Sequence, residues 1–115
     1  MGDWRLLRAN EILKQEIGRI LEEDLERSPS DLVTVTRVDA SPDLQHAKVY
    51  ISIFPEERAK DLWRILSFSI FDIQQKLNKR MTTRPVPKIE WVVEKNMGEI
   101  QKMDEIFDKI EKQEK

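Results

Sequence analysis

The chain has 115 residues, 37% of them charged, with a net charge of −2, and this length predicts a single domain over residues 1–115 with one hydrophobic core. It has no cysteine, which excludes disulfides and thiolate metal sites, and no apolar run approaches the roughly 18 residues of a membrane span. Because the N-terminus alternates charged and apolar residues, unlike a signal peptide, we expect a soluble protein of the cytoplasm.

The first predicted element is a helix that Asp3 caps and that ends near Leu25. Arg5 and Arg8 project away from its apolar side. A breaker segment, residues 26–31, separates this helix from the first predicted strand. The apolar residues of the helix recur every three or four positions and form one stripe: Leu6, Ala9, Leu13, Ile17, Ile20 and Leu21.

Residues 33–54 are predicted to form two strands joined by a turn. The first run is rich in β-branched residues, which suit a half-buried pleated surface. Ser41, Pro42 and Asp43 supply the turn chemistry. Two strands alone are marginally stable in water, so flanking helices must cover their apolar face. In the second strand that face carries Ala47, Val49, Ile51 and Ile53.

A long second helix is predicted over residues 55–80. Phe68 lies nearly opposite its stripe, and Ile65 and Phe71 also fall outside it. These residues either contact a second surface or mark a change of helical phase near Ser67 and Ser69, whose hydroxyls can compete for backbone bonds. We favour the change of phase, because the alternative leaves a phenylalanine in water. The stripe consists of Ala59, Leu62, Leu66, Ile70, Ile73 and Leu77.

The third predicted strand follows a segment with two prolines. Pro85 and Pro87 push the residues before them toward extended geometry, which excludes helix. Ile89, Trp91 and Val93 then alternate with more polar positions. The long helix therefore connects the second strand to the third as a crossover, which normally joins parallel strands.

A last helix is predicted over about residues 100–115, with a frayed end, because Asn96 and Glu99 resemble a capping box. The predicted order is helix, strand, strand, long kinked helix, strand, helix. The fold class is therefore α+β, a three-stranded mixed sheet with helices packed on one face.

Charge is distributed unevenly along the chain. Residues 73–89 carry five basic and no acidic residues, whereas residues 90–115 carry five lysines against eight acidic residues. Lysine and arginine neutralise phosphates, so the basic run is a candidate RNA contact. Its structural alternative, compensation of charge at a helix C-terminus, suits Lys76, Lys79 and Arg80 better than Arg84 and Lys88. From the residues alone the two readings are about even.

The residues predict no catalytic or metal site. His46 is the sole histidine, so a pair of histidine ligands and a Cys–His nucleophile are excluded. Ser41, Asp43 and His46 crowd into one turn, where turn formation explains them better than catalysis. Tyr50 is a weak candidate for stacking on a base. The other large aromatic residues considered are assigned to the core or its rim: Trp4, Trp63, Trp91 and Phe68.

Four motifs in this order resemble the ribosome-binding factor A family, bacterial factors of small-subunit assembly. They cover most of the chain, roughly residues 5–110. Each motif is weak by itself, and their order and separations make the resemblance specific. The motifs are Arg5-x-x-Arg8; Val33-Thr34-Val35-Thr36 with Val38; Ser41-x-Asp43-Leu44-x-x-Ala47-Lys48-Val49-Tyr50-Ile51-Ser52; and Arg84-x-Val86-Pro87.

This resemblance implies a type II KH-like fold in which a helix–kink–helix unit replaces the usual glycine-rich RNA-clamping loop. It also implies binding to the immature small ribosomal subunit through its rRNA, support for late rRNA maturation, often in the cold, and no catalysis or cofactor. We expect a monomer when free, and no binding to DNA or membranes. The expected RNA contacts are Arg5, Arg8, Arg37, Lys48, Lys76, Lys79, Arg80, Arg84 and Lys88.

The chain departs from the family pattern at the kink. Where the family typically has Ala-x-Gly, then an apolar pair and an arginine, this sequence has Ser69-Ile70-Phe71 and, at the arginine position, Gln74. Glycine permits a sharp break that phenylalanine does not, so the bend here is expected to be gentler or driven by serine. A second reading of the function is a protein-binding module in which Phe68 and Phe71 form an apolar patch for a ribosomal protein or another assembly factor.

Overall fold

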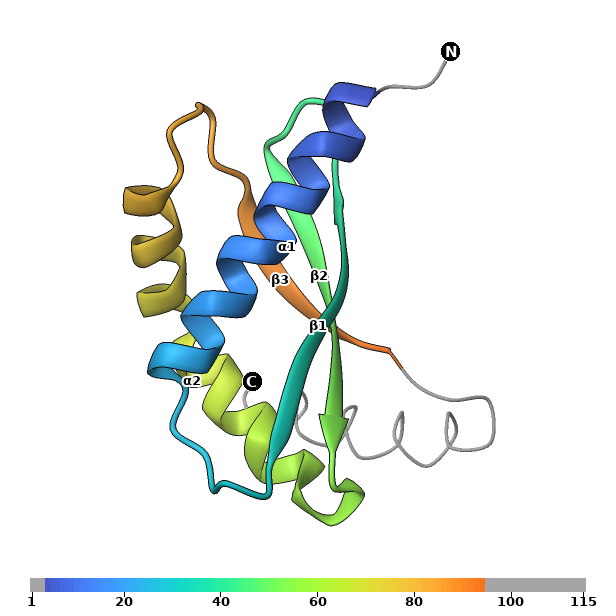
Figure 1. Ribbon diagram of the computed structural model, residues 1–115, viewed down its shortest axis with the longest axis vertical. Helices are drawn as coiled ribbons and strands as arrows, with labels where there is room; N and C mark the ends of the chain where they lie inside the picture. Colours follow the sequence, from blue (N-terminus) through green and yellow to red (C-terminus); the bar gives the residue numbers. More distant parts are fainter. Residues whose placement is uncertain (1–3, 95–115) are drawn as a thin grey trace, which may run out of the picture.

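The computed structural model describes residues 4–94, which form two helices, three strands and one short 3-10 turn (Figure 1). The element order agrees with the prediction, and the predicted last helix lies outside the described residues. The elements are α1 (Trp4–Asp24), β1 (Leu32–Ala40), β2 (His46–Phe54), the 3-10 turn η1 (Glu56–Arg58), α2 (Ala59–Arg80) and β3 (Lys88–Val93).

The three strands form one mixed sheet in the order β1-β2-β3. β1 pairs with β2 antiparallel and β2 pairs with β3 parallel, so the predicted crossover through α2 is confirmed. α1 and α2 lie on the same side of this sheet (Figure 1), and the sheet face toward them is apolar. Its buried residues are Val33, Val35, Val38, Ala40, Ala47, Val49, Ile51, Ile89 and Trp91.

A bulge in β1 keeps its apolar residues on the core side. The register shifts between Val35, which pairs with Ile51, and Arg37, which pairs with Tyr50, so Thr36 is the extra residue. Side chains alternate between the two faces of a strand, and an inserted residue reverses the alternation beyond it. Without the bulge Arg37 would point into the core. With it, Val38 and Ala40 are buried instead.

The turn between β1 and β2 is held by the side chains predicted to form it. The Ser41 hydroxyl donates to Asp43 Oδ1 at 2.6 Å and accepts from the backbone N–H of His46 at 3.1 Å. The Ser41 hydroxyl, followed by the Gln45 backbone N–H, lowers the pKa of Asp43. Leu44 adopts a left-handed φ of 57°. These bonds give Ser41 and Asp43 a structural role.

The core lies between the helices and the sheet, and the two predicted stripes supply it. Ile70 is only partly buried but packs against the core, and Leu6 does the same near the start of α1. The fully buried positions of the two helices are Leu13, Ile17, Ile20 and Leu21 in α1 and Ala59, Leu62, Leu66, Ile73 and Leu77 in α2.

Helix α2 changes direction part-way along its length (Figure 1), and its predicted kink is thereby confirmed. The Trp91 indole N–H donates to the Leu66 carbonyl oxygen at 3.0 Å. That carbonyl would ordinarily accept only the N–H four residues on, and an inserted donor is a recognised cause of helix bending. Within residues 4–94 no side-chain hydrogen bond of Ser67 or Ser69 accompanies the bend, so the serine-driven mechanism was wrong.

The expectation that a change of phase would keep Phe68 out of water was also wrong. Phe68 is 90% exposed and Phe71 is 69% exposed. The bend redirects the axis of α2 and leaves these two rings on its outer side. Two exposed aromatic rings are tolerated because folding requires only that enough apolar surface be buried elsewhere.

A buried ion pair ties the segment before β1 to the start of α2. Asp31 is 2% exposed and accepts the Ser28 backbone N–H at 3.0 Å and two nitrogens of Arg58, one of them Nη2 at 3.1 Å. The Arg58 guanidinium, followed by the Ser28 N–H, lowers the pKa of Asp31. The other side of that guanidinium contacts the exposed Asp61 at 2.9 Å.

Replacing Asp31 with asparagine should lower the melting temperature at pH 7 and flatten its response to acid. Because the folded state holds the Asp31 pKa below its usual range, the unfolded chain binds more protons as acid is added. The contribution of Asp31 is therefore complete above about pH 4 and is lost as pH falls through the folded pKa. Thermal unfolding followed by circular dichroism from pH 7 to pH 3 should show parent and Asp31→Asn converging in acid.

Asp61→Asn is the matched control for this variant, since it removes a carboxylate from the same arginine at an exposed site. It should change the melting temperature little, because exposed ion pairs contribute little. Equal melting temperatures for parent and Asp31→Asn at pH 7 would rule out a stabilising role for the pair.

Candidate nucleic-acid interface

The basic residues predicted to contact RNA separate into three groups in the structure. One group lies at the end of the molecule where α1 begins, another lies on the second half of α2, and the third lies on the outer face of the sheet. The groups are, in that order, Arg5, Arg8, Arg84 and Lys88; Lys76, Lys79 and Arg80; and Arg37 and Lys48.

The first group surrounds the entry to the loop between α2 and β3. Arg5 and Arg8, both exposed, line a cavity together with Thr83, Pro85 and Pro87 of that loop. Local bonds hold the loop near them: Arg84 Nη1 donates to the Met81 carbonyl oxygen at 3.1 Å, and the Lys88 backbone N–H donates to the Gln45 carbonyl oxygen at 2.9 Å. Segments far apart in the sequence thus bring four cations to one end.

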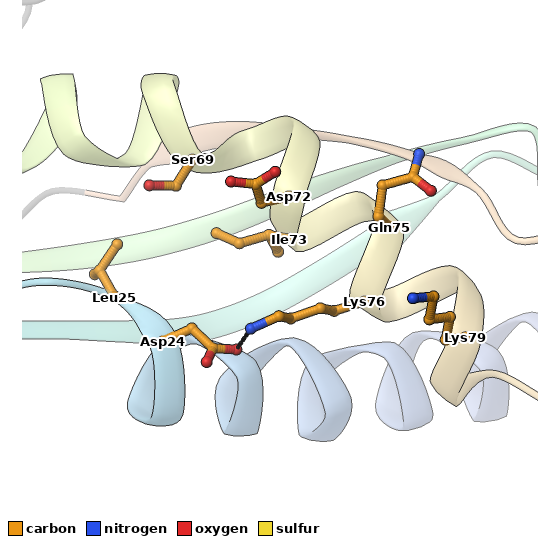
Figure 2. A pocket seen from close by; sticks show the side chains of 8 residues that line it. All are labelled: Asp24, Leu25, Ser69, Asp72, Ile73, Gln75, Lys76 and Lys79. Carbon is orange, nitrogen blue, oxygen red and sulfur yellow. Dashed lines mark ion pairs between the residues drawn. The ribbon is translucent and has the colours of Figure 1, made fainter.

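The second group is largely neutralised by acids at the end of α1. Lys76 Nζ lies 2.5 Å from Asp24 Oδ2, and Arg80 Nη2 lies 2.5 Å from Glu23 Oε2. Hydrogen bonding to Glu23 raises the pKa of Arg80 further. Figure 2 shows Lys76 reaching across a cavity of about 370 Å³ to Asp24, with Lys79 one turn further along the same helix. Within residues 4–94, Lys79 has no ion pair.

The third group is balanced by its neighbours in the sheet. The Arg37 guanidinium lies 3.7 Å from the centre of the Tyr50 ring, and its Nε lies 3.5 Å from Glu94 Oε1. The guanidinium therefore occupies a face of Tyr50 that a base would need. Lys48 pairs in register with Asp39 on one side and Glu90 on the other, which surrounds it with negative charge.

Five of the predicted cations therefore remain available to an anionic partner, three are paired with acids of the chain, and Lys48 lies between two acidic neighbours in the sheet without an ion pair among residues 4–94. A basic residue beside a carboxylate of the same chain presents less net positive charge to a phosphate, because the carboxylate offsets its field. We call the available residues the free-cation cluster: Arg5, Arg8, Arg84 and Lys88 at the end where α1 begins, and Lys79 on the second half of α2.

Gln74 occupies the position where the family pattern has an arginine, and its side chain is committed to the fold. Its Nε2 donates to the Pro87 carbonyl oxygen at 3.0 Å, and its Oε1 accepts the Ile89 backbone N–H at 2.9 Å. These two bonds hold the approach to β3 against α2. Gln74 therefore positions the loop that carries Arg84, and it offers no cation of its own.

Two exposed aromatic residues that line cavities were assigned to the core or its rim from the sequence. Trp4, assigned to the core or its rim, is 63% exposed and lines the same cavity as Arg5 and Arg8. Its position directly before Arg5-x-x-Arg8 was the available signal. Phe68 lines a second hollow of about 380 Å³ with Ile65, beside the acids Asp24 and Glu26.

Residues 4–94 were also searched for a metal site, a free catalytic hydroxyl and a membrane-spanning helix. Among residues 4–94, no group of three or more histidine, aspartate or glutamate side chains is placed to hold a metal ion. The Ser41 hydroxyl is used by Asp43 and by the backbone of His46. No helix of the same range is long and apolar enough to span a membrane.

Comparison with known proteins gives a consistent set of matches. The family model described as ribosome-binding factor A matches residues 5–107. Ribosome-binding factor A of Clostridium botulinum (strain Okra / Type B1) is 33% identical over 117 residues, covering 99% of this chain and 97% of the relative. The crystal structure of ribosome-binding factor A from Thermus thermophilus aligns with a TM-score of 0.64 at 25% identity, covering 76% of this chain and 93% of that one.

A further structural match comes from a ribosomal complex. It is a homology model of the Thermus thermophilus factor fitted into the cryo-EM map of its complex with the 30S subunit. It aligns with a TM-score of 0.58 at 27% identity, covering 72% of this chain and 88% of that one.

Proposed function

The chain belongs to the ribosome-binding factor A family, and from this membership we propose that it binds the immature small ribosomal subunit through its rRNA and assists late maturation of that rRNA. It acts in the cytoplasm as a monomer, by binding alone, without a cofactor or a catalytic step. The proposal is consistent with the 30S complex of the related Thermus thermophilus factor.

The observation that carries the proposal is the free-cation cluster. Its five side chains come from α1, the end of α2, the following loop and the start of β3, and they have no ion-pair partner among residues 4–94. Because the backbone that carries these cations is already packed, only their side chains have to be ordered when they meet phosphates. A surface of this kind recognises the shape of a folded RNA through its backbone, and it reads no base sequence.

Association with small subunits should weaken steeply as salt is raised. Each phosphate neutralised by a lysine or arginine releases counterions, so five contacts imply a loss of affinity of about 10²-fold between 50 and 200 mM salt. Co-sedimentation of the purified chain with small subunits through a sucrose cushion, at stepped KCl concentrations, measures this directly. Large subunits serve as the control particle.

A second candidate is favoured by the exposure of Phe68 and Phe71, which suits an apolar contact with a ribosomal protein or another assembly factor. The same salt series separates the two. Contact through apolar rings persists at high salt, whereas contact through phosphates does not. Absence of the chain from the small-subunit fraction at every salt concentration would contradict both.

A further inference from the structure

The cavity beside Arg5 and Arg8 is lined mainly by apolar residues and borders the free-cation cluster at the end where α1 begins. It measures about 240 Å³ and lies between the first turns of α1 and the loop after α2. Leu13, which is 1% exposed, belongs to the core and lies on its wall. The full lining is Trp4, Arg5, Arg8, Ala9, Ile12, Leu13, Leu44, Met81, Thr83, Pro85 and Pro87.

The rim of the cavity is positive and carries no acid. None of the lining residues is an aspartate or a glutamate. Arg5 and Arg8 have no ion pair among residues 4–94. Arg84 lies between the lining residues Thr83 and Pro85, and its Nη1 is held 3.1 Å from the carbonyl oxygen of Met81, another lining residue. An occupant must therefore combine an apolar part with negative charge beside it.

The size and the walls of the cavity select a small planar group. Its volume lies below the roughly 300 Å³ at which pockets begin to hold drug-sized ligands, so it fits one ring system. Trp4 and Ile12 are 63% and 40% exposed, and an exposed tryptophan beside two guanidinium groups is the kind of platform on which unpaired bases stack. The phosphates on either side of such a base meet the arginines.

We infer that this cavity binds one unpaired nucleotide of single-stranded RNA, with its base against Trp4 and its flanking phosphates on Arg5, Arg8 and Arg84. The inference rests on the proposed function and adds its ligand: a base extruded from, or never taken into, a duplex. Base pairing keeps a base inside the stack, so duplex RNA offers this site only phosphates.

The test compares two single strands with the same backbone and a duplex of the same length. They are a fluorescein-labelled single-stranded RNA about ten nucleotides long, within the span that single-strand binding folds cover, the same strand with abasic nucleotides at its centre, and a duplex of the same length. Fluorescence anisotropy gives the Kd of each. The intact strand should bind about 10-fold more tightly than the abasic strand, since one stacked base contributes about that factor.

Trp4→Ala should remove the difference between the intact and abasic strands and leave the binding of the abasic strand and its salt dependence unchanged. Leu7→Ala is the matched control, because Leu7 is 66% exposed on the same helix and does not line the cavity. Ala9→Leu, which adds bulk to the wall, should act like Trp4→Ala. All three positions are at least partly exposed, and circular dichroism verifies that each variant is folded.

The outcomes distinguish failure of the nucleotide site from failure of the proposed function on which it rests. Equal, salt-sensitive binding of the intact and abasic single strands would overturn the nucleotide site and leave phosphate contact standing. Binding of none of them would overturn both the site and the contact with rRNA. If Trp4→Ala and Ala9→Leu still bound the intact strand more tightly than the abasic strand, the base would bind elsewhere, and the inference would also be overturned.

Discussion

The double variant Lys79→Glu/Arg84→Glu is expected to bind small ribosomal subunits about 10²-fold more weakly than the parent near 0.1 M salt. Each lost phosphate contact lowers affinity by about 10-fold at this ionic strength and reduces the slope against salt by about one. Both side chains are exposed, and neither has an ion pair among residues 4–94, so the loss should arise from the partner and not from unfolding. Co-sedimentation at several salt concentrations measures affinity and slope together.

Lys60→Glu/Arg64→Glu is the matched control, since it makes the same change of charge at exposed positions on the first half of the same helix. Both double variants should unfold thermally close to the parent, as surface substitutions usually do. In cells, replacement of the chain by Lys79→Glu/Arg84→Glu should leave small-subunit rRNA unprocessed, more severely in the cold. Equal association of the two double variants would place the contact away from the free-cation cluster.

Trp91→Ala is expected to cost about 3–5 kcal/mol of the free energy of unfolding, a large share of the roughly 5–15 kcal/mol that holds a small domain folded. Trp91 is 8% exposed on β3, and its indole N–H reaches the Leu66 carbonyl oxygen on α2. Its removal leaves a cavity between sheet and helix and takes away the bond at the bend. Urea unfolding followed by circular dichroism measures the loss.

Trp91→Phe separates packing from hydrogen bonding, because it keeps an aromatic ring and removes the donor. It should cost about 1–2 kcal/mol, the range for losing a bond to a buried acceptor. Trp4→Phe makes the same substitution at a site that is 63% exposed, and should change stability by no more than about 0.5 kcal/mol. If Trp91→Phe were as stable as the parent, the indole bond would contribute nothing net to the fold.

Much of the fold was predictable because periodicity reports which face of an element is buried. The stripe of α2 and the alternation of β2 correspond to buried residues almost position by position. The bulge at Thr36 was not predicted, because a one-residue shift in pairing depends on the partner strand. The bend of α2 was predicted with the wrong cause: the donor is Trp91, 25 residues further along the chain from Leu66.

The basic residues of the candidate site could be predicted from the sequence. Which of them are free of ion pairs, and so can contact a phosphate, could not. Family membership was confirmed, and the basic run up to Lys88 was visible from composition. That Lys76 and Arg80 would meet Asp24 and Glu23 was not visible, because those pairs join residues more than fifty positions apart. Local sequence shows charge, but only the packing of α1 against α2 shows which charges are already paired.

Helix α1 carries Arg5 and Arg8 in its first turns, whereas its last turn carries Glu22, Glu23 and Asp24, of which Glu23 and Asp24 are offset by Arg80 and Lys76 of α2. The helix macrodipole points the same way, positive where the arginines lie. A chain with a net charge of −2 is repelled by a polyanion as a whole, yet this dipole moment exerts a torque that turns its arginine end forward during approach. On the function proposed above, diffusional encounters with a ribosomal particle would be pre-oriented, and lowering the ionic strength should accelerate capture despite the like sign of the two net charges.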